Sequence, residues 1–280
     1  MAITAANAMN EAIAGKLPMV TIIKNGVTME AIGVFHSTFY TGIVPAGGVA
    51  NSAGMEGVAL TSVQGQIPFP APAAGKTTYL HKLKAFCTTT QKMYIADRLW
   101  HQSGINQNTV GTPQVISAPA DPATYFPFPP RDENFSSNGV GVMIGLEASV
   151  AGTNSVSTAT VIYTNSDGVS DRTGTISINS SIALGTLCVM GLQGDDKGVR
   201  SVQSITLNTA VTSAILHLVA FRFLTSIVTV GSSSAGYYSE VDPFTGEFPA
   251  LADYTVPWVV ILPSTTAGTT LIMDITYTQV

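Results

Sequence analysis

The residues most suggestive of chemistry are Gly75-Lys76-Thr77, which match the end of a phosphate-binding loop. Such a loop needs a glycine five residues before Gly75, because backbone N–H groups there wrap the phosphates. Position 70 is Pro70, which has no backbone N–H. The glycines of Gly139-x-Gly141-x-x-x-Gly145 have the wrong spacing for a dinucleotide site. The sequence therefore predicts no nucleotide site.

The histidines give no metal or catalytic pattern either. His36, His81, His101 and His217 are scattered, and none lies at a metal-ligand spacing from another histidine, a cysteine or a carboxylate. A zinc site would have to be assembled from distant segments, and the Gly-x-Ser-x-Gly elbow of many hydrolases is missing. Paired carboxylates for glycoside hydrolysis are a spatial feature, and nothing in the sequence supports them. We therefore expect no catalytic residue, no cofactor and no metal, and predict that the chain is not an enzyme.

Oxygen-bearing side chains cluster around Gly168, from Asn165 to Asp171. Such a cluster can bind Ca²⁺, although it lacks the terminal glutamate of an EF-hand loop. The interpretation we favour is a β-turn whose Asn and Asp side chains accept hydrogen bonds from nearby N–H groups. Asp195-Asp196 before Lys197-Gly198 likewise indicates a polar turn, and Arg200 and Arg222 are expected to pair with these carboxylates.

Charged residues are scarce. The 12 Lys and Arg and the 17 Asp and Glu make up 10% of the 280 residues, against about 25% in ordinary soluble proteins. The hydrophobic share is 45% and the mean hydropathy is +0.32, yet no apolar stretch approaches the roughly 18 residues of a membrane span. The net charge is −5, and the densest basic cluster is Lys82 with Lys84, which argues against nucleic-acid binding. We expect other subunits to cover this surface, with a secreted β-protein as the alternative.

The cellular compartment can also be inferred from the sequence. Residues 1–16 lack the basic region and the apolar core of a signal peptide. Cys87 and Cys188 lie in apolar runs, which favours buried free thiols over a disulfide. We therefore expect the chain to be made in a cytoplasm.

From residue 76 onward, short runs rich in Thr, Val and Ile repeat with turns between them and without intervening helices. The run over 269–280 alternates best. Four apolar residues share one of its faces: Leu271, Met273, Ile275 and Tyr277. In the run over 214–224, the odd-numbered and the even-numbered residues are both apolar, apart from His217 and Arg222. This is expected of a strand that is covered on both faces. The predicted fold is all-β, a jelly-roll-like antiparallel β-sandwich.

The chain divides into two predicted parts, an N-terminal arm over 1–75 and the sandwich over 76–280. Thr4 can cap a short helix that Pro18 stops, Asn25-Gly26 predicts a hairpin turn, and residues 47–75 predict an extended connector. The helix either packs on its own domain or docks on a neighbour. Two long loop insertions, over 103–138 and 231–256, interrupt the sandwich and are rich in aromatic residues.

The arrangement of turns and strands over 159–224 carries a family resemblance. Its segments are Ile162 to Thr173, Leu192 to Ser204 and Leu216 to Leu224. This quarter of the chain resembles structural proteins of tailed bacteriophages, of the head-associated kind. The resemblance implies a virion component on or in the capsid, assembled in the host cytoplasm, with no catalytic residues.

Three functions remain as hypotheses. The first is a capsid decoration or cement protein, or another head subunit, that stabilises the shell through contacts between subunits. Its partners would be the major capsid protein or further copies of itself in a homo-oligomer, for which a trimer is one option. The second is a receptor- or carbohydrate-binding tail or fibre module, and a jelly-roll major capsid protein is a further alternative to the first. The third, an esterase or glycosidase on a β-scaffold, has the least support.

Candidate interface residues are the apolar side chains of the arm and the two insertions. They are Ile3, Met9, Ile13, Tyr125, Phe126, Phe128, Tyr237, Tyr238, Phe244 and Phe248.

Overall fold

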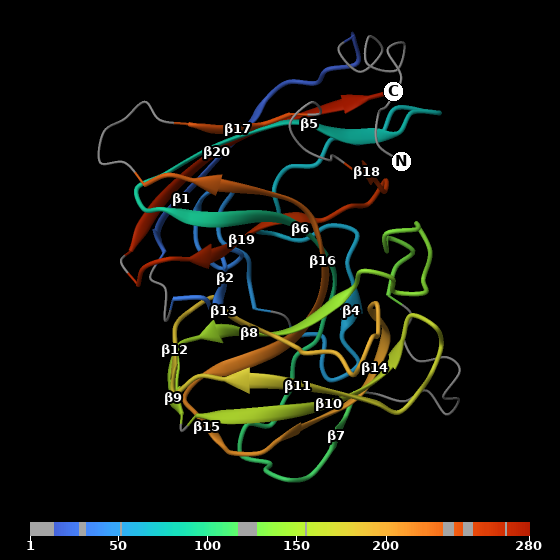
Figure 1. Ribbon diagram of the computed structural model, residues 1–280, viewed down its shortest axis with the longest axis vertical. Coiled ribbons are helices and arrows are strands. Elements are labelled where there is room, and N and C mark those ends of the chain that lie inside the picture. Colours follow the sequence, from blue (N-terminus) through green and yellow to red (C-terminus); the bar gives the residue numbers. More distant parts are fainter. Residues whose placement is uncertain are drawn as a thin grey trace.

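A computed structural model describes residues 14–27, 32–50, 52–116, 128–154, 156–231, 238–242, 249–266 and 268–280. The twenty elements named within these ranges, β1 to β20, are all strands. They stack in three layers, which Figure 1 shows from top to bottom. Among these residues, no helix has the length and apolarity to cross a membrane. The all-β antiparallel sandwich predicted from the sequence is confirmed.

The middle layer is a closed ring of six strands. Its members are β2 (Phe35–Ser37), β6 (Gln91–His101), β8 (Met143–Val150), β13 (Thr186–Val189), β16 (Ile215–Thr229) and β19 (Pro257–Pro263). They pair in the order β16-β8-β13-β2-β19-β6, and the pairing of β16 with β6 closes the ring. With 15 residues, β16 is long enough to reach both neighbours, so Val219 lies opposite Gly145 of β8 and His101 of β6. The short β4 (Val58–Ala59) pairs with β6 outside the ring.

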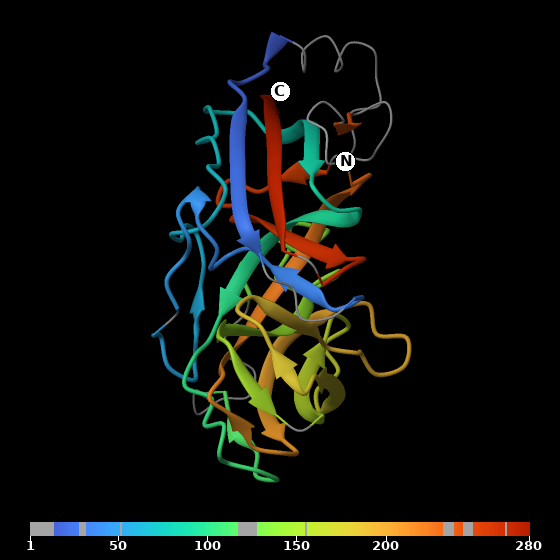
Figure 2. The same ribbon diagram turned by 90° about the vertical axis from the view of Figure 1, so that its left-hand side faces the viewer.

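An outer sheet lies on each side of the ring. The upper sheet contains β1 (Val20–Val27), β3 (Ile43–Val44), β5 (Thr78–Cys87), β17 (Ser239–Val241), β18 (Ala250–Leu251) and β20 (Thr269–Gln279). The lower sheet contains β7 (Gln114–Val115), β10 (Ser157–Asn165), β11 (Arg172–Ile178) and β14 (Val199–Leu207). A third small sheet joins β9 (Gly152–Asn154), β12 (Ser181–Ile182) and β15 (Val211–Thr212). Figure 2 shows β1 and β20 of the upper sheet side by side.

Alternation along each ring strand supplies three apolar cores. Leu218 of β16 packs in the lower core with Val161 and Ile205 of the lower sheet, whereas Ile95 of β6 packs in the upper core with Leu83. A third set of side chains lies inside the ring: Ala96, Leu187, Val219, Phe221, Trp258 and Val260, with Phe39. Each fully buried Leu or Ile contributes about 1.5–3 kcal/mol, so the ring strands are held from both faces.

The structure tests several of the local expectations. The apolar face predicted for 269–280 is confirmed, because Leu271, Met273, Ile275 and Tyr277 are at most 1% exposed. Cys87 and Cys188 are free and buried, as expected. All but the first residue of the run over 214–224 falls in β16, which is largely buried after its exposed first residue, Ile215.

The hairpin turn predicted at Asn25-Gly26 is wrong. β1 runs through both residues, with a bulge between Lys24 and Val27 where it pairs with β20. The strand continues because Thr269 of β20 still lies opposite Val27. More broadly, β1 belongs to the upper sheet, β2 to the ring, and β4 pairs with β6. Strands from the predicted arm thus join both the upper sheet and the ring. The predicted helix lies almost entirely outside the described residues.

An ion pair occupies the inside of the ring. Arg98 of β6 and Glu147 of β8 are both 0% exposed. Arg98 donates from Nη1 to Oε1 of Glu147 at 3.0 Å and from Nη2 to Oε2 at 2.6 Å. The guanidinium also lies 4.1 Å from the ring centroid of Phe39 and 4.9 Å from that of Trp258. Bidentate geometry and the two aromatic faces offset part of the cost of burying two charges.

Three of the four histidines surround this pair. His217 lies opposite Glu147 in the strand register, and His101 Nδ1 is 3.4 Å from Arg98 Nη2. His36 of β2 is 2% exposed. Burial lowers the pKa of His36 to about 4 despite the attraction of Glu147. Burial and the charge of Arg98 lower the pKa of His101 to about 3, and burial lowers the pKa of His217 as well. All three histidines are therefore neutral at pH 7.

Removing one partner of the ion pair should destabilise the ring strongly. Glu147→Gln leaves the Arg98 guanidinium buried without its anion, so we expect the free energy of unfolding to fall by about 3–5 kcal/mol. The double variant Arg98→Met/Glu147→Leu buries no lone charge and should lose less. Urea unfolding followed by circular dichroism measures both. Wild-type stability in Glu147→Gln would show that the pair is not the constraint described here.

Acid should weaken the fold before the carboxylates protonate. The unfolded chain binds histidine protons near pH 6.5, whereas in the folded chain His36 binds one only near pH 4. The unfolded state therefore holds more protons in this window, and stability falls as the pH drops from about 6.5 to about 4. At about 1.4 kcal/mol per pKa unit, His36 alone accounts for about 3 kcal/mol.

Urea unfolding at about pH 7, 5.5 and 4.5 measures this dependence. His36→Asn should flatten it, whereas His81→Asn, at a half-buried position of the upper sheet, should change it much less. An equal slope in wild type and His36→Asn would contradict the assignment.

Candidate functional site

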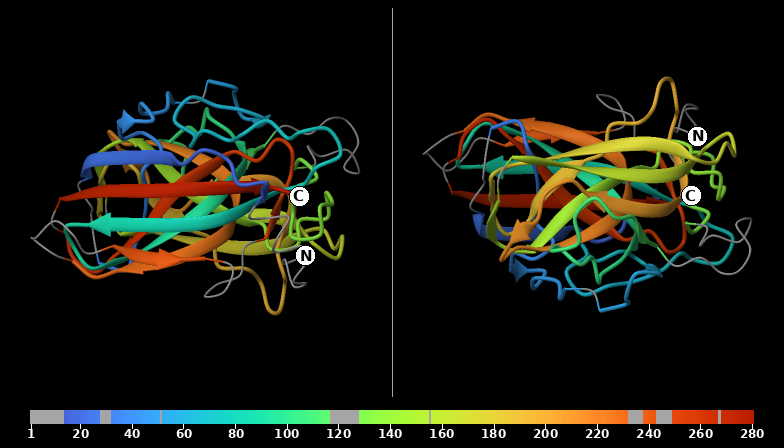
Figure 3. Two further views of the ribbon diagram at one scale, coloured as in Figure 1. Left: turned by 90° about the horizontal axis from the view of Figure 1, so that it is seen from above. Right: turned by 90° about the horizontal axis from the view of Figure 1, so that it is seen from below.

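The outer face of the upper sheet combines aromatic rings, charges and a hollow. β1, β20, β5 and β17 lie side by side there, as the left-hand view of Figure 3 shows. Inward residues such as Ile22 and Met273 are buried in the upper core, so their sequence neighbours point outward. Because the strands are in register, the outward residues form rows that cross the sheet.

One of these rows is apolar. Val44 lies opposite Ile23, Ile23 opposite Ile272, and Ile272 opposite Phe86. The ring of Tyr238, just before β17, lies 6.0 Å from that of Phe86. Val44 is 43% and Tyr238 53% exposed. The row therefore presents apolar and aromatic surface to solvent.

The next row is charged. Thr21 lies opposite Asp274, Asp274 opposite Lys84, and Lys84 opposite Glu240. Lys84 Nζ is 3.2 Å from Glu240 Oε2, and Lys82 pairs with the other carboxylate oxygen. The hydrogen bonds from Lys82 and Lys84 hold the pKa of Glu240 below its ordinary value. These side chains are about a third or more exposed, and such pairs contribute at most about 1 kcal/mol to stability. The row therefore gives the face a charge pattern more than it stabilises the fold.

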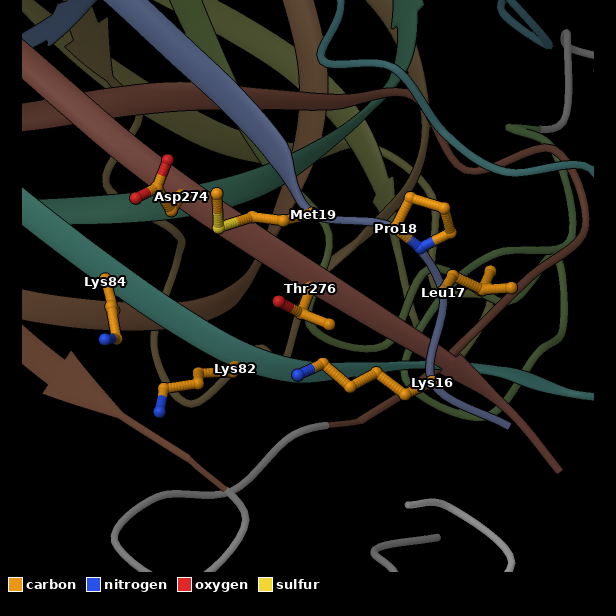
Figure 4. A pocket seen from close by; sticks show the side chains of 8 residues that line it. All are labelled: Lys16, Leu17, Pro18, Met19, Lys82, Lys84, Asp274 and Thr276. Atoms are coloured by element: carbon orange, nitrogen blue, oxygen red, sulfur yellow. The ribbon is translucent and has the colours of Figure 1, made fainter. Parts of the chain in front are cut away.

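A groove of about 520 Å³ borders the charged row (Figure 4). The chain over 16–19 forms one wall, held where Leu17 N donates to Tyr277 O at 2.9 Å. The remaining lining comes from β5 and β20. The lining residues are Lys16, Leu17, Pro18, Met19, Lys82, Lys84, Asp274 and Thr276. They offer ammonium groups, one carboxylate and an apolar wall, which are binding groups, and they contain no Ser–His or Cys–His pair.

The structure describes two of the ten predicted interface residues. Phe128 is 3% exposed and packs against Trp100, with ring centroids 5.7 Å apart, so it belongs to the lower core. Tyr238 lies at the end of the apolar row. The other eight lie outside the described residues: Ile3, Met9, Ile13, Tyr125, Phe126, Tyr237, Phe244 and Phe248.

The turn predicted around Gly168 is confirmed. Asn165 Oδ1 accepts hydrogen bonds from the backbone N–H of Asp167 at 3.1 Å and of Val169 at 2.9 Å. Gly168 has a φ of +83°, which a side chain would strain. Backbone groups thus occupy the Asn165 oxygen that a cation would need. Within the described ranges, no group of three or more His, Cys, Asp and Glu is placed to hold a metal.

The predicted partner of Asp196 is wrong. Its carboxylate accepts from Arg172 Nε at 2.9 Å, Tyr163 Oη at 2.5 Å and Asn165 Nδ2 at 2.7 Å. The Arg172 hydrogen bonds, with those of Tyr163 and Asn165, lower the pKa of Asp196 to about 2. Arg222 lies elsewhere, 3% exposed and close enough to Asp97 for the two charges to interact. Strand pairing brings Arg222 opposite Asp97, which outweighs proximity in sequence.

Sequence reasoning missed this second buried charged group. Arg131 Nε lies 3.1 Å from Asp97 Oδ2, and Asp97 Oδ1 accepts from Val256 N at 2.9 Å. Arg131 also donates to the carbonyls of Leu60, Tyr254 and Arg98. It therefore fastens the end of the first long insertion to the ring. The available signal was a charged residue, Asp97 or Arg222, inside a run that otherwise predicts a buried strand.

Replacing Phe128 or Tyr238 by alanine should affect stability to different extents. Phe128→Ala opens a cavity beside Trp100 and should lower the free energy of unfolding by about 3–5 kcal/mol. Tyr238→Ala removes a half-exposed ring that contacts Phe86 and should cost about 0.5–1.5 kcal/mol. Urea unfolding of the two variants checks this order, which similar losses would refute.

Comparisons with known proteins leave the chain without an assigned family. No protein-family model and no curated protein matches the sequence. Among solved structures, the Gt strain of infectious bursal disease virus aligns with 95% of this chain and 82% of its own, at 11% identity and a TM-score of 0.18. T=1 particles derived from infectious bursal virus align with 95% and 78%, at 12% identity and a TM-score of 0.18. The VP2 subviral particle aligns with 94% and 79%, at 11% identity and a TM-score of 0.12. Likenesses this low carry no argument about fold or function.

Proposed function

We propose that this chain is a structural, non-enzymatic subunit of a virus particle, in the head of a tailed phage, where it acts as a decoration or cement protein. The supporting observation is where its few charges lie. Seven of its charged side chains are at most 3% exposed: Lys24, Asp97, Arg98, Arg131, Asp132, Glu147 and Arg222. The surface is therefore poorer in charge than the composition already indicates, and such a surface favours association.

Exposed apolar side chains add to this support. Val156 is 78% exposed, Val230 70%, Ile32 66% and Val49 63%. Exposed apolar residues are individually common on monomers. Here they occur on a chain with few charged residues, and contact with other subunits explains this combination.

A second candidate function rests on the upper sheet. Tyr238, Phe86 and the charged groove together resemble the chemistry of a site for a polar ligand with an apolar face, such as a carbohydrate. A receptor- or carbohydrate-binding module would use this face. A subunit of a shell would use it to contact a partner such as the major capsid protein. We favour the shell subunit because the charge scarcity extends beyond this one face.

The test is whether the purified chain assembles. Sedimentation velocity from low to high micromolar concentration should show oligomers or larger particles that persist in high salt, because salt does not screen contacts between uncharged side chains. When phage particles are separated on a density gradient, an antibody against the chain should also detect it in the fraction that contains the particles. A monomer at every concentration, missing from the particle fraction, would refute the proposal.

A further inference from the structure

The outer face of the lower sheet differs in chemistry from that of the upper sheet. Along β10, Ala159, Val161 and Tyr163 are 0% exposed and belong to the lower core. The alternate residues of β10 therefore point away from the core. They are Thr158, Thr160, Ile162 and Thr164. The right-hand view of Figure 3 looks at the molecule from this side.

Strand register extends these residues into rows of hydroxyl groups. Thr160 lies opposite Thr175 of β11 and Thr206 of β14. Ile162 lies between Thr173 and Ser204, and Ser204 in turn lies opposite Val115 of β7. Thr158 lies opposite Ser177. We call the outward residues of these three rows the hydroxyl face.

The hydroxyl face contains no ionisable side chain. It consists of Thr158, Thr160, Ile162, Thr173, Thr175, Ser177, Ser204, Thr206 and Val115. Thr173, Thr175 and Ser177 are exposed, and the outward residues of β10 and β14 are half-buried by their neighbours. In the central row, the hydroxyls of Thr175, Thr160 and Thr206 make no hydrogen bond to any other described residue.

We propose that the hydroxyl face is the surface through which one copy of this chain contacts a second copy. The inference rests on the proposed function and deepens it by naming the contact. A hydroxyl group both donates and accepts hydrogen bonds, so a face of Thr and Ser is complementary to a copy of itself. A face of carboxylates or ammonium groups would repel its copy.

Charge favours the same occupant. The chain has a net charge of −5, so two copies approach most easily through a face without charges. Burying this face costs no desolvation of an ion. The upper sheet, on the far side of the ring, carries the row of Asp274, Lys84 and Glu240 instead. In this proposal the two outward faces have different roles: the upper face, with its charged and apolar rows, contacts a different partner, and the lower face contacts a second copy.

The size of the face predicts a weak single contact. With strands about 4.8 Å apart and residues about 3.4 Å apart along each strand, the hydroxyl face has an area of roughly 400 Å². Each partner in a standard interface buries about 800 Å². Pairing through this face alone should therefore depend on concentration, and many such contacts would strengthen one another in a shell.

Charge placed at the centre of the hydroxyl face tests the inference. In Thr160→Lys, like charges would meet across a two-fold contact, so we expect self-association to weaken at least tenfold by sedimentation velocity. Thr160→Glu should weaken it similarly. Thr61→Lys and Thr61→Glu are the matched controls, because Thr61 is exposed on the loop after β4 and lies outside both outer faces. They change the net charge equally and should associate as the wild type does.

Mixing the two central variants separates loss of contact from loss of fold. If copies meet face to face, equal amounts of Thr160→Lys and Thr160→Glu should associate at least as well as the wild type, which misfolded chains would not do. Wild-type association in both separate variants would overturn the inference and leave the proposed function standing. Weakened association that mixing fails to restore would also overturn it. Failure of the wild type to associate at all would overturn the proposed function as well.

Discussion

The closed ring is built around a charged pair that has no access to water. Arg98 and Glu147 come from strands that are separated in the ring by β16, and two hydrogen bonds join them at zero exposure. A buried pair of this kind is costly unless every strand that encloses it stays in place. The aromatic faces of Phe39 and Trp258 and the neutral His101 and His217 complete the enclosure. Closure of the ring and burial of the pair thus depend on each other.

The ring in turn fixes the two outer sheets. Its outward side chains form one wall of the upper core and one wall of the lower core, so the sheets are held on opposite sides of one rigid layer. Each sheet buries one face and leaves the other to solvent. Strand register then decides what each exposed face presents. On the upper sheet it lines up Ile23, Ile272 and Phe86, and on the lower sheet Thr175, Thr160 and Thr206. Surface chemistry in this molecule therefore follows from pairing within the sheets.

Local sequence patterns predicted individual strands and turns better than they predicted which strands pair with each other. The alternation around Met273 and the turn at Gly168 were both visible in the sequence, because each depends on a few neighbouring residues. The continuation of β1 through Asn25 was not visible in the sequence. Pairing with β20, some 240 residues away, overrides a dipeptide that favours a turn.

The candidate site likewise combines residues that the sequence places together with residues that only the fold brings together. Lys82 and Lys84 stood out as a cluster in the sequence, but their neighbours Glu240 and Lys16 join them only through the sheet and the groove. The buried charges were equally hidden. Asp97, Arg98 and Glu147 lie in runs that predict covered strands, and a lone charge in such a run signals a buried partner without naming it. Arg222 illustrates the limit, since its neighbour Asp97 is set by the antiparallel register of β16 and β6.

Electron cryo-microscopy of assemblies of the purified chain would test the central claim most directly. The account predicts particles in which neighbouring copies meet through the lower sheets, with Thr160 and Thr175 at the contact and Lys84 and Glu240 facing away from it. Monomers alone, or particles in which the lower sheets face solvent and copies meet through the upper sheets, would contradict it.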